Sequence, residues 1–211
     1  MNPITLLRSQ KLPAAFYERK NVCTVAKGLL GKILVSNFDN RLTAGRIVET
    51  EAYNGPADKA SHAWNGRRTS RTEIMYRHGG VAYVYFCYGI HHMFNVVTNV
   101  ADIPHAVLVR ALEPVAGIQS MLARTSKAKA DFTLTKGPGN LAKALGIHTS
   151  HSGMDLQSDA LFIADDGVRI PAAAIAATPR IGVAYAGDDA LLPYRFLVKN
   201  NPYVSGKKLA D

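Results

Sequence analysis

The sequence has few cysteines and no long hydrophobic run. Cys23 and Cys87 are the only cysteines among 211 residues. They are too few for a disulfide framework, and their apolar neighbours favour buried thiols in a reducing, intracellular setting. No segment approaches the roughly 18 apolar residues of a membrane span, and the first residues lack the apolar region and cleavage site of a secretory signal. These absences argue against a disulfide-rich secreted protein and against a membrane protein.

Several catalytic motifs are also missing. The chain has no CxxC, HExxH or GxSxG, and residues 136–140 (KGPGN) lack the Lys-Ser/Thr ending of a phosphate-binding P-loop. His91 and His92 are adjacent, so on a strand they point to opposite faces, and His62 has no second ligand at a recognised spacing. We therefore expect no metal and no cofactor. A metal-dependent hydrolase that uses Glu51 and His62 stays open as an alternative.

Acidic side chains are outnumbered. The 25 Lys and Arg residues face 16 Asp and Glu residues, which gives a formal net charge of +9. Such an excess attracts polyanions, nucleic acid first and anionic membrane surfaces second, although solubility alone could also explain it. Within the polar segment 54–80, guanidinium groups that suit phosphate oxygens gather in a short span, although a charge cluster is more often a solvated face. They are Arg67, Arg68, Arg71 and Arg77.

Local patterns predict one α+β domain built on antiparallel hairpins. Residues 22–30 have the spacing of an amphipathic helix, residues 32–38 and 42–53 form a first hairpin, and residues 81–88 and 92–100 form a second. Residues 106–111 are typical of a buried strand, Pro114 opens a helix, and a Gly-Pro-Gly turn precedes another short helix. DALFIADD, RIGVAYAG and YRFLVKN indicate strands and turns. The domain covers residues 1–211, with 1–11 and 206–211 as candidate flexible tails.

The stretch RIVETEAYNG, residues 46–55, places two acids near the end of a predicted strand. Strict alternation sends Ile47, Glu49, Glu51 and Tyr53 to one face. A strand glutamate is most often a solvated surface residue. Beside a tyrosine and a long polar loop, however, Glu51 could serve as a general base that takes a proton from water.

The second hairpin is rich in aromatic residues. Alternation puts Tyr83, Tyr85 and Cys87 on one face, so Tyr85 can line a pocket, whereas Phe86 on the other face fills the core. Cys87 is better interpreted as a core residue than as a nucleophile. Tyr88 precedes a glycine at the predicted tip, where it either projects as a wedge that enters between DNA base steps or folds back over the core.

Five stretches stand in order along the chain: RIVETEAYNGPADKASH, YVYFCYGIHHMFN, VLVRALEP, KGPGNLAKALGI and RIGVAYAG. Together they resemble the motifs of the alkyladenine DNA glycosylase family, also called 3-methyladenine or N-methylpurine DNA glycosylases. The resemblance extends from about residue 12 to residue 205. It implies an α+β fold with a mixed, mainly antiparallel, curved sheet, surrounding helices and a protruding β-hairpin that intercalates into DNA.

The resemblance also implies a reaction. Members of this family flip a damaged purine nucleotide out of duplex DNA and hydrolyse the bond between base and sugar, without metal or cofactor. The implied lesions are 3-methyladenine, 7-methylguanine, hypoxanthine and ethenoadenine. Water rather than a protein amine is the expected nucleophile, so the enzyme is expected to be monofunctional and to leave an abasic site. The sequence identifies no general acid for neutral bases.

Residue roles follow from the matching motifs. By the resemblance, Glu51 falls on the general base, and Tyr88 on the side chain that intercalates where the base used to be. The implied base pocket contains Tyr53, His62, Tyr85, Asn95 and Arg110, with Asn95 discriminating against guanine.

The implied partner is double-stranded DNA with damaged purines, bound by a monomer. The implied location is the cytoplasm or nucleoid of a bacterium, or the nucleus of a eukaryote. A non-catalytic protein that binds damaged DNA is the alternative, and it would be indifferent to Glu51→Gln.

Overall fold

One antiparallel sheet organises the computed structural model, which describes residues 7–206. Its strands are β1 (Ile33–Phe38), β2 (Arg41–Tyr53), β3 (Ala82–Cys87), β4 (His91–Thr98), β5 (His105–Ala116), β6 (Leu161–Ala164), β7 (Ile175–Thr178) and β8 (Arg195–Val198). The order is β3-β4-β5-β2-β1-β6, while β8 pairs with β2 and β7 pairs with β8. The expected α+β class is confirmed. The expected mixed sheet is wrong, because every strand pairing in the described chain is antiparallel.

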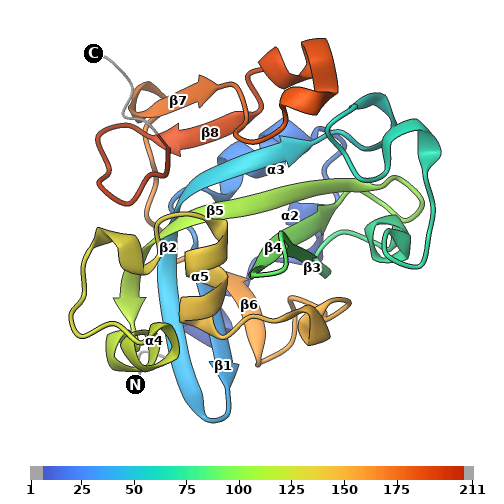
Figure 1. Ribbon diagram of the computed structural model, residues 1–211. Coiled ribbons are helices and arrows are strands. Elements are labelled where there is room, and N and C mark those ends of the chain that lie inside the picture. The colour runs from blue at the N-terminus through green and yellow to red at the C-terminus, as the bar shows by residue number, and fades with distance from the viewer. Residues whose placement is uncertain (1–6, 207–211) are drawn as a thin grey trace.

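Short α-helices pack on this sheet. They are α2 (Ala14–Tyr17), α3 (Val22–Leu29), α4 (Ile118–Thr125) and α5 (Pro138–Leu145). In Figure 1, α4 and α5 lie in front of the long strands and α3 lies behind β2. The main core cluster joins apolar residues of α3 and α5 to those of the central strands, so one continuous core supports the sheet.

Local signals place α3 and α5. The Asn21 side chain accepts a hydrogen bond from the backbone N–H of Thr24 (3.1 Å) and caps the start of α3. Pro138 occupies the first turn of α5, and Gly146 ends that helix with a left-handed φ of 68°. Helix α3 therefore lies within the predicted range 22–30, whereas α5 begins at Pro138, inside the Gly-Pro-Gly stretch that was expected to precede it.

Strand β2 runs through the middle of the sheet. It pairs with β5 along one edge and with β1 and then β8 along the other. The register is irregular between Ile47 and Glu49, and Ile47 packs in the main core with Ala52. The strict alternation expected for residues 47–53 is therefore wrong, because a β-bulge separates Ile47 from the face that carries Glu49 and Glu51.

Two other expectations about elements are corrected. Pro114 does not open a helix: it lies inside β5, opposite Gly45, where the ladder is irregular and the missing N–H of proline is tolerated. Helix α4 starts at Ile118, after Gly117 in a left-handed conformation (φ 75°). The end of RIGVAYAG enters a 3-10 helix, η7 (Ala184–Leu191), instead of a strand.

Three side chains are less buried than expected. Phe86 is 50% exposed, so it does not fill the core. Cys23 and Cys87 are free and only half-buried. The polar segment 54–80 contains no strand; its 3-10 helices are η1 (Gly55–Ala57), η2 (Trp64–Gly66) and η3 (Glu73–Tyr76).

The described residues near the start of the chain extend the sheet. Of the segment 1–11, Lys11 forms a β-bridge with Ala164, and its Nζ lies 2.7 Å from Asp159 Oδ1. Residues 1–6 and 207–211 of the two expected tails lie outside the described residues. No helix between residues 7 and 206 has the length and apolar character needed to cross a membrane.

Candidate active site

A cavity of about 560 Å³ opens beside the β3–β4 hairpin. Its lining includes Glu51, the expected general base, and every residue that the resemblance assigned to the base pocket: Tyr53, His62, Tyr85, Asn95 and Arg110. Residues distant in the sequence meet here because one face of the sheet forms the floor.

A single row of side chains crosses that floor. Tyr83 pairs with Asn95, and both Asn95 and Glu51 pair with Leu108 of the strand between them. Side chains of directly paired residues in antiparallel strands lie on the same face. All four of these residues line the cavity, so strand register alone brings the acid to the hairpin.

Glu51 is fully buried and hydrogen-bonded. Its Oε1 accepts a hydrogen bond from the backbone N–H of Ile181 (2.8 Å) and lies 3.1 Å from Arg110 Nη1. Its Oε2 accepts one from the Tyr53 hydroxyl (2.8 Å). A carboxylate offers about four lone-pair positions. In the described chain, Oε2 therefore keeps a position that no protein donor uses.

Arg110 connects Glu51 to a second buried acid. It is the extra residue of β5 at a second bulge, between the pairs Glu49–Ala111 and Thr50–Val109. Its Nε donates to Glu49 Oε1 (2.9 Å). Burial lowers the pKa of Arg110, but the nearby Glu51 and Glu49 charges outweigh burial and raise the pKa overall. Arg110 is therefore a fixed cation behind Glu51.

Arg180 was given no role in the sequence analysis, yet it holds the wall behind Tyr53. Its guanidinium donates twice to the buried carboxylate of Asp58, with one donor–acceptor distance of 2.8 Å. Its Cζ lies 4.8 Å from the centre of the Tyr53 ring. Burial, followed by the Glu51 charge, raises the pKa of Tyr53 well above its usual value, so its hydroxyl stays a donor. The only sequence signal for Arg180 was its place in RIGVAYAG.

The opposite wall contains Tyr85 and His62. Their rings meet edge to face with centres 4.6 Å apart. His62 Nδ1 lies 2.9 Å from the Tyr83 hydroxyl, and His62 Nε2 lies 3.4 Å from Arg71 Nη2. Burial, then the charges of Arg71 and Arg67, lower the pKa of His62 to about 4. The imidazole is therefore neutral at physiological pH.

Asn95 is held rigidly in the cavity wall. It is 3% exposed, and its Nδ2 donates to the backbone carbonyls of Tyr83 (3.2 Å) and Met93 (3.1 Å). Because both neighbours only accept hydrogen bonds, the orientation of the amide is fixed. The Asn95 side chain cannot turn aside without losing both bonds.

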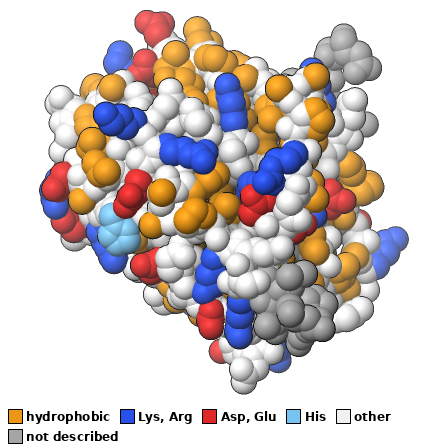
Figure 2. Space-filling model, turned by 180° about the vertical axis from the view of Figure 1, so that it is seen from behind, with side chains coloured by type: hydrophobic (Ala, Val, Ile, Leu, Met, Phe, Trp, Pro, Cys, Tyr) orange, Lys and Arg blue, Asp and Glu red, His pale blue; other side chains and the backbone are white. Residues whose placement is uncertain are grey.

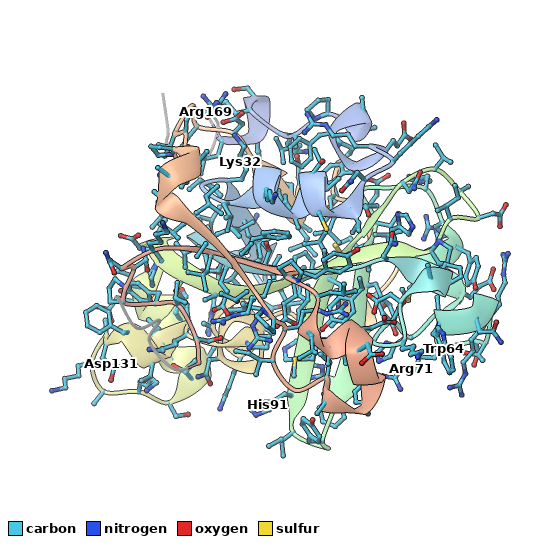
Figure 3. The ribbon with its side chains drawn as sticks, turned by 90° about the horizontal axis from the view of Figure 1, so that it is seen from above. Lys32, Trp64, Arg71, His91, Asp131 and Arg169 are labelled. Atoms are coloured by element: carbon cyan, nitrogen blue, oxygen red, sulfur yellow. The ribbon has the colours of Figure 1, made fainter. Side chains whose placement is uncertain are left out.

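Tyr88 stands at the hairpin tip. Its side chain is 82% exposed, so it does not fold back over the core. Its backbone has a left-handed φ of 53°, which is uncommon for a residue with a side chain. Ile90 beside it is 69% exposed. In Figure 3 the hairpin, next to the labelled His91, extends beyond the surrounding structure.

The four arginines of segment 54–80 have different surroundings. Arg71 lies over the Tyr85 ring, with Cζ 5.1 Å from its centre, and lines the cavity. Arg68 pairs with Glu73 (2.6 Å) and Asp102 (2.9 Å). Arg77 donates to the carbonyl of Gly153 (2.8 Å). Of these four, Arg67 alone has a guanidinium without a hydrogen bond or ion pair to another described residue.

The face opposite the hairpin carries both positively and negatively charged side chains. Figure 2 shows Lys and Arg side chains interspersed with Asp and Glu side chains over this face. In Figure 3, Lys32 and Arg169 lie on the side away from His91, and they contact Asp165 at 2.8 Å and 2.7 Å. Cations on this side thus have acidic neighbours. Across the described residues, no three His, Cys, Asp or Glu side chains gather as a metal-binding group.

Comparison with known proteins adds to this geometry. The family model described as methylpurine-DNA glycosylase (MPG) matches residues 15–202. A protein of Bacillus cereus (strain G9842) named "Putative 3-methyladenine DNA glycosylase" is 48% identical over 204 residues, covering 92% of this chain and 98% of that protein. A protein of Chlamydia pneumoniae with the same name is 44% identical over 196 residues, covering 92% and 97%.

Proposed function

Because the chain belongs to the methylpurine-DNA glycosylase family, we propose that it flips an alkylated or deaminated purine nucleotide out of duplex DNA and hydrolyses its N-glycosidic bond, leaving an abasic site. The observation that carries this proposal is the buried Glu51 carboxylate on the floor of an aromatic cavity of about 560 Å³. The bound lesions are 3-methyladenine, 7-methylguanine, hypoxanthine and ethenoadenine.

Glu51 acts as the general base. Donors from Tyr53, Ile181 and Arg110 hold its two oxygens in place, and the free position on Oε2 accepts a water molecule. Glu51 takes a proton from this water as the water attacks the sugar carbon. The negative charge also stabilises the positive charge that develops on the sugar as the bond to the base breaks.

The cavity walls suit a cationic base. Tyr53 and Tyr85 line the cavity, and each cation–π contact with an alkylated purine contributes about 0.5 to 2 kcal/mol. His62 is neutral, with a pKa of about 4, so it does not repel such a base. Asn95, which cannot turn aside, disfavours the exocyclic amine of guanine. 7-methylguanine carries the same amine, and the cation–π contacts of its positive charge offset this cost.

Tyr88 fills the position that the flipped nucleotide leaves. Base flipping costs a few kcal/mol of stacking and pairing, and an exposed aromatic wedge at a hairpin tip offsets part of this cost. The cavity lining within the described chain includes no lysine. This supports water as the nucleophile and a monofunctional enzyme that leaves the strand uncut. The protein acts as a monomer on duplex DNA, in the cytoplasm or at the nucleoid.

The test compares wild type with Glu51→Gln on duplex oligonucleotides that contain one hypoxanthine or one ethenoadenine, in the presence of EDTA. Heating in alkali then cuts the strand at each abasic site. We expect Glu51→Gln to slow base release by about 10² to 10⁴ while the duplex is still bound. Glu113→Gln, in an exposed residue of β5, is the matched control and should behave as wild type.

The other outcomes separate the alternatives. Equal base release by wild type and Glu51→Gln would refute the role of Glu51. If the protein binds these duplexes without releasing a base, a 3-methyladenine substrate is tested next. Binding without release there as well would favour a non-catalytic protein that binds damaged DNA. Activity that EDTA abolishes would favour a metal-dependent hydrolase.

A further inference from the structure

A second cavity, of about 420 Å³, lies beside the first. Its lining comes from segment 54–80 and η7: Lys59, Ser61, His62, Trp64, Arg67, Thr69, Arg71, Thr72 and Tyr185. His62, Arg71 and Tyr185 line both cavities, so the two are adjacent. Figure 3 shows Trp64 and Arg71 on the same segment, next to η7.

The charge of this second cavity is positive. Its lining has three cationic residues and no acidic one. Within residues 7–206, the side chains of Lys59 and Arg67 have neither a hydrogen bond nor an ion pair. The nearby Asp189 accepts a hydrogen bond from the backbone N–H of Lys59 (2.8 Å). Arg68, in the same segment, is in contrast paired with two acids. Unpaired cations at a concave surface fit a phosphate group.

The same cavity presents exposed aromatic rings. Trp64 is 49% exposed and Tyr185 is 70% exposed. The turn after Trp64 holds Asn65 and Gly66 in left-handed conformations, with φ of 56° and 71°. The Tyr185 hydroxyl donates to the carbonyl of Ala60 (3.2 Å), which fixes that ring. Exposed rings beside unpaired cations are the combination that binds unpaired nucleotides, because bases stack on the rings while cations contact phosphates.

We propose that the second cavity binds a second nucleotide of the DNA, the neighbour of the flipped one on the same strand. Its base stacks on Trp64, and its phosphate lies between Lys59 and Arg67. The proposal rests on the proposed function, because the first cavity must hold the flipped nucleotide. DNA next to the lesion is then unstacked on two successive nucleotides, with Tyr185 between the two bases.

Trp64 reports directly on its own site, because it is the only tryptophan in the chain. Glu51→Gln protein is mixed with a duplex that contains one ethenoadenine, so that binding is observed without turnover, and with an undamaged duplex. We expect quenching of tryptophan fluorescence that saturates with the lesion duplex at the concentration where anisotropy shows binding. Binding without any change in the fluorescence of Trp64 would refute the proposal.

A cycle of two changes tests the stacking contact itself. The neighbouring base is removed by placing a baseless spacer on one side of the lesion and then on the other, and Trp64 is changed to Ala. Each change alone should weaken binding by about five- to a hundredfold. The baseless spacer on the correct side and Trp64→Ala remove the same contact. At that spacer position, combining the two changes should therefore weaken binding no more than either change alone. Additive losses at both positions would overturn the proposal.

Two variants control this cycle. Trp64→Phe keeps a stacking ring and should retain most of the affinity. Phe132→Ala removes another exposed ring, which is 53% exposed and lies against Tyr203, and it should bind as wild type. Melting temperatures identify any variant that fails to fold.

The activity assay keeps the two proposals apart. If Trp64 is quenched and the cycle is non-additive, but base release fails, the proposed reaction is wrong and the second nucleotide site stands. If base is released but the two losses of affinity are additive, the proposed reaction stands and the second nucleotide site is wrong. Failure to bind any duplex would refute both.

Discussion

Acid should destabilise this protein through one histidine of the cavity wall. Arg71 has only donor groups, so its contact with His62 Nε2 (3.4 Å) requires that nitrogen to accept, and Nδ1–H then donates to the Tyr83 hydroxyl (2.9 Å). A second proton would have to sit on Nε2, facing the guanidinium. Burial and the charges of Arg71 and Arg67 accordingly lower the pKa of His62 from 6.5 to about 4.

The sign and size of the effect follow from that pKa. As the pH falls below 6.5, the unfolded chain binds a proton at His62 before the folded chain does, so the free energy of unfolding decreases until the pH reaches about 4. One pKa unit corresponds to about 1.4 kcal/mol. Because the ring is partly exposed, we expect a loss of about 2 kcal/mol between pH 8 and about pH 4.5, less than the full shift implies.

Urea unfolding measures this loss. Wild type and His62→Gln are unfolded near pH 8 and at about pH 4.5, and the change between the two pH values is compared. Other groups titrate in both proteins, so the comparison isolates His62. Wild type should lose about 2 kcal/mol more than His62→Gln does. An equal loss in the two proteins would show that His62 is protonated in the folded protein as readily as in the unfolded chain.

Three further outcomes are expected. Arg110→Met removes the ion-pair partner of the buried Glu51, while Glu49 keeps Arg195. Chemical denaturation should show a loss of about 3 to 5 kcal/mol, and a loss below about 1 kcal/mol would contradict the buried network. Tyr88→Ala should weaken binding to a lesion duplex by about tenfold or more without changing the melting temperature, because the ring is 82% exposed; Leu191→Ala, in a side chain 72% exposed on η7, is its control. Gly139→Ala brings a Cβ within 2.5 Å of His91 Nδ1 and should cost about 1 to 3 kcal/mol in urea unfolding; unchanged stability would mean that His91 moves freely.

The sequence predicts the local elements of this fold well. The two hairpins and the helix before the first strand depend on short-range patterns of apolar residues, turn residues and a cap at Asn21, and the structure confirms them. The resemblance also named residues that do line one cavity. Their proximity depends on the register by which β2 and β4 both pair with β5 at Leu108, and no local pattern contains that register.

Irregularities of the ladder explain the main errors. Alternation assumes one residue against one, but β2 has an extra residue after Ile47, and β5 has an extra residue at Arg110. A bulge whose extra residue has a negative φ requires no particular residue type, so the sequence contains little sign of it. Phe86 was misplaced for a different reason: the hairpin leaves the sheet near its tip, and the face that is buried at Val84 is half exposed two residues later.

Glu49 and Glu51 illustrate how much of the site depends on distant partners. Both acids are fully buried on the same strand, and by residue type and alternation they are equivalent. Glu49 has four protein donors, one more than Glu51. Arg110, Arg195 and the Ser205 hydroxyl donate to its Oε1, and the Ser205 N–H donates to its Oε2. It does not line the cavity, and its role is to hold Arg110 and Ser205 in place.

Glu51 differs because the neighbouring strand β8 ends its pairing with β2 at this residue. The chain before η7 then contributes a single backbone donor, from Ile181. A fourth protein donor would make Glu51 a structural acid like its neighbour. Its three donors instead leave one acceptor position on Oε2 for a group in the cavity. The chemical difference between two acids two residues apart therefore comes from segments more than a hundred residues further along the chain.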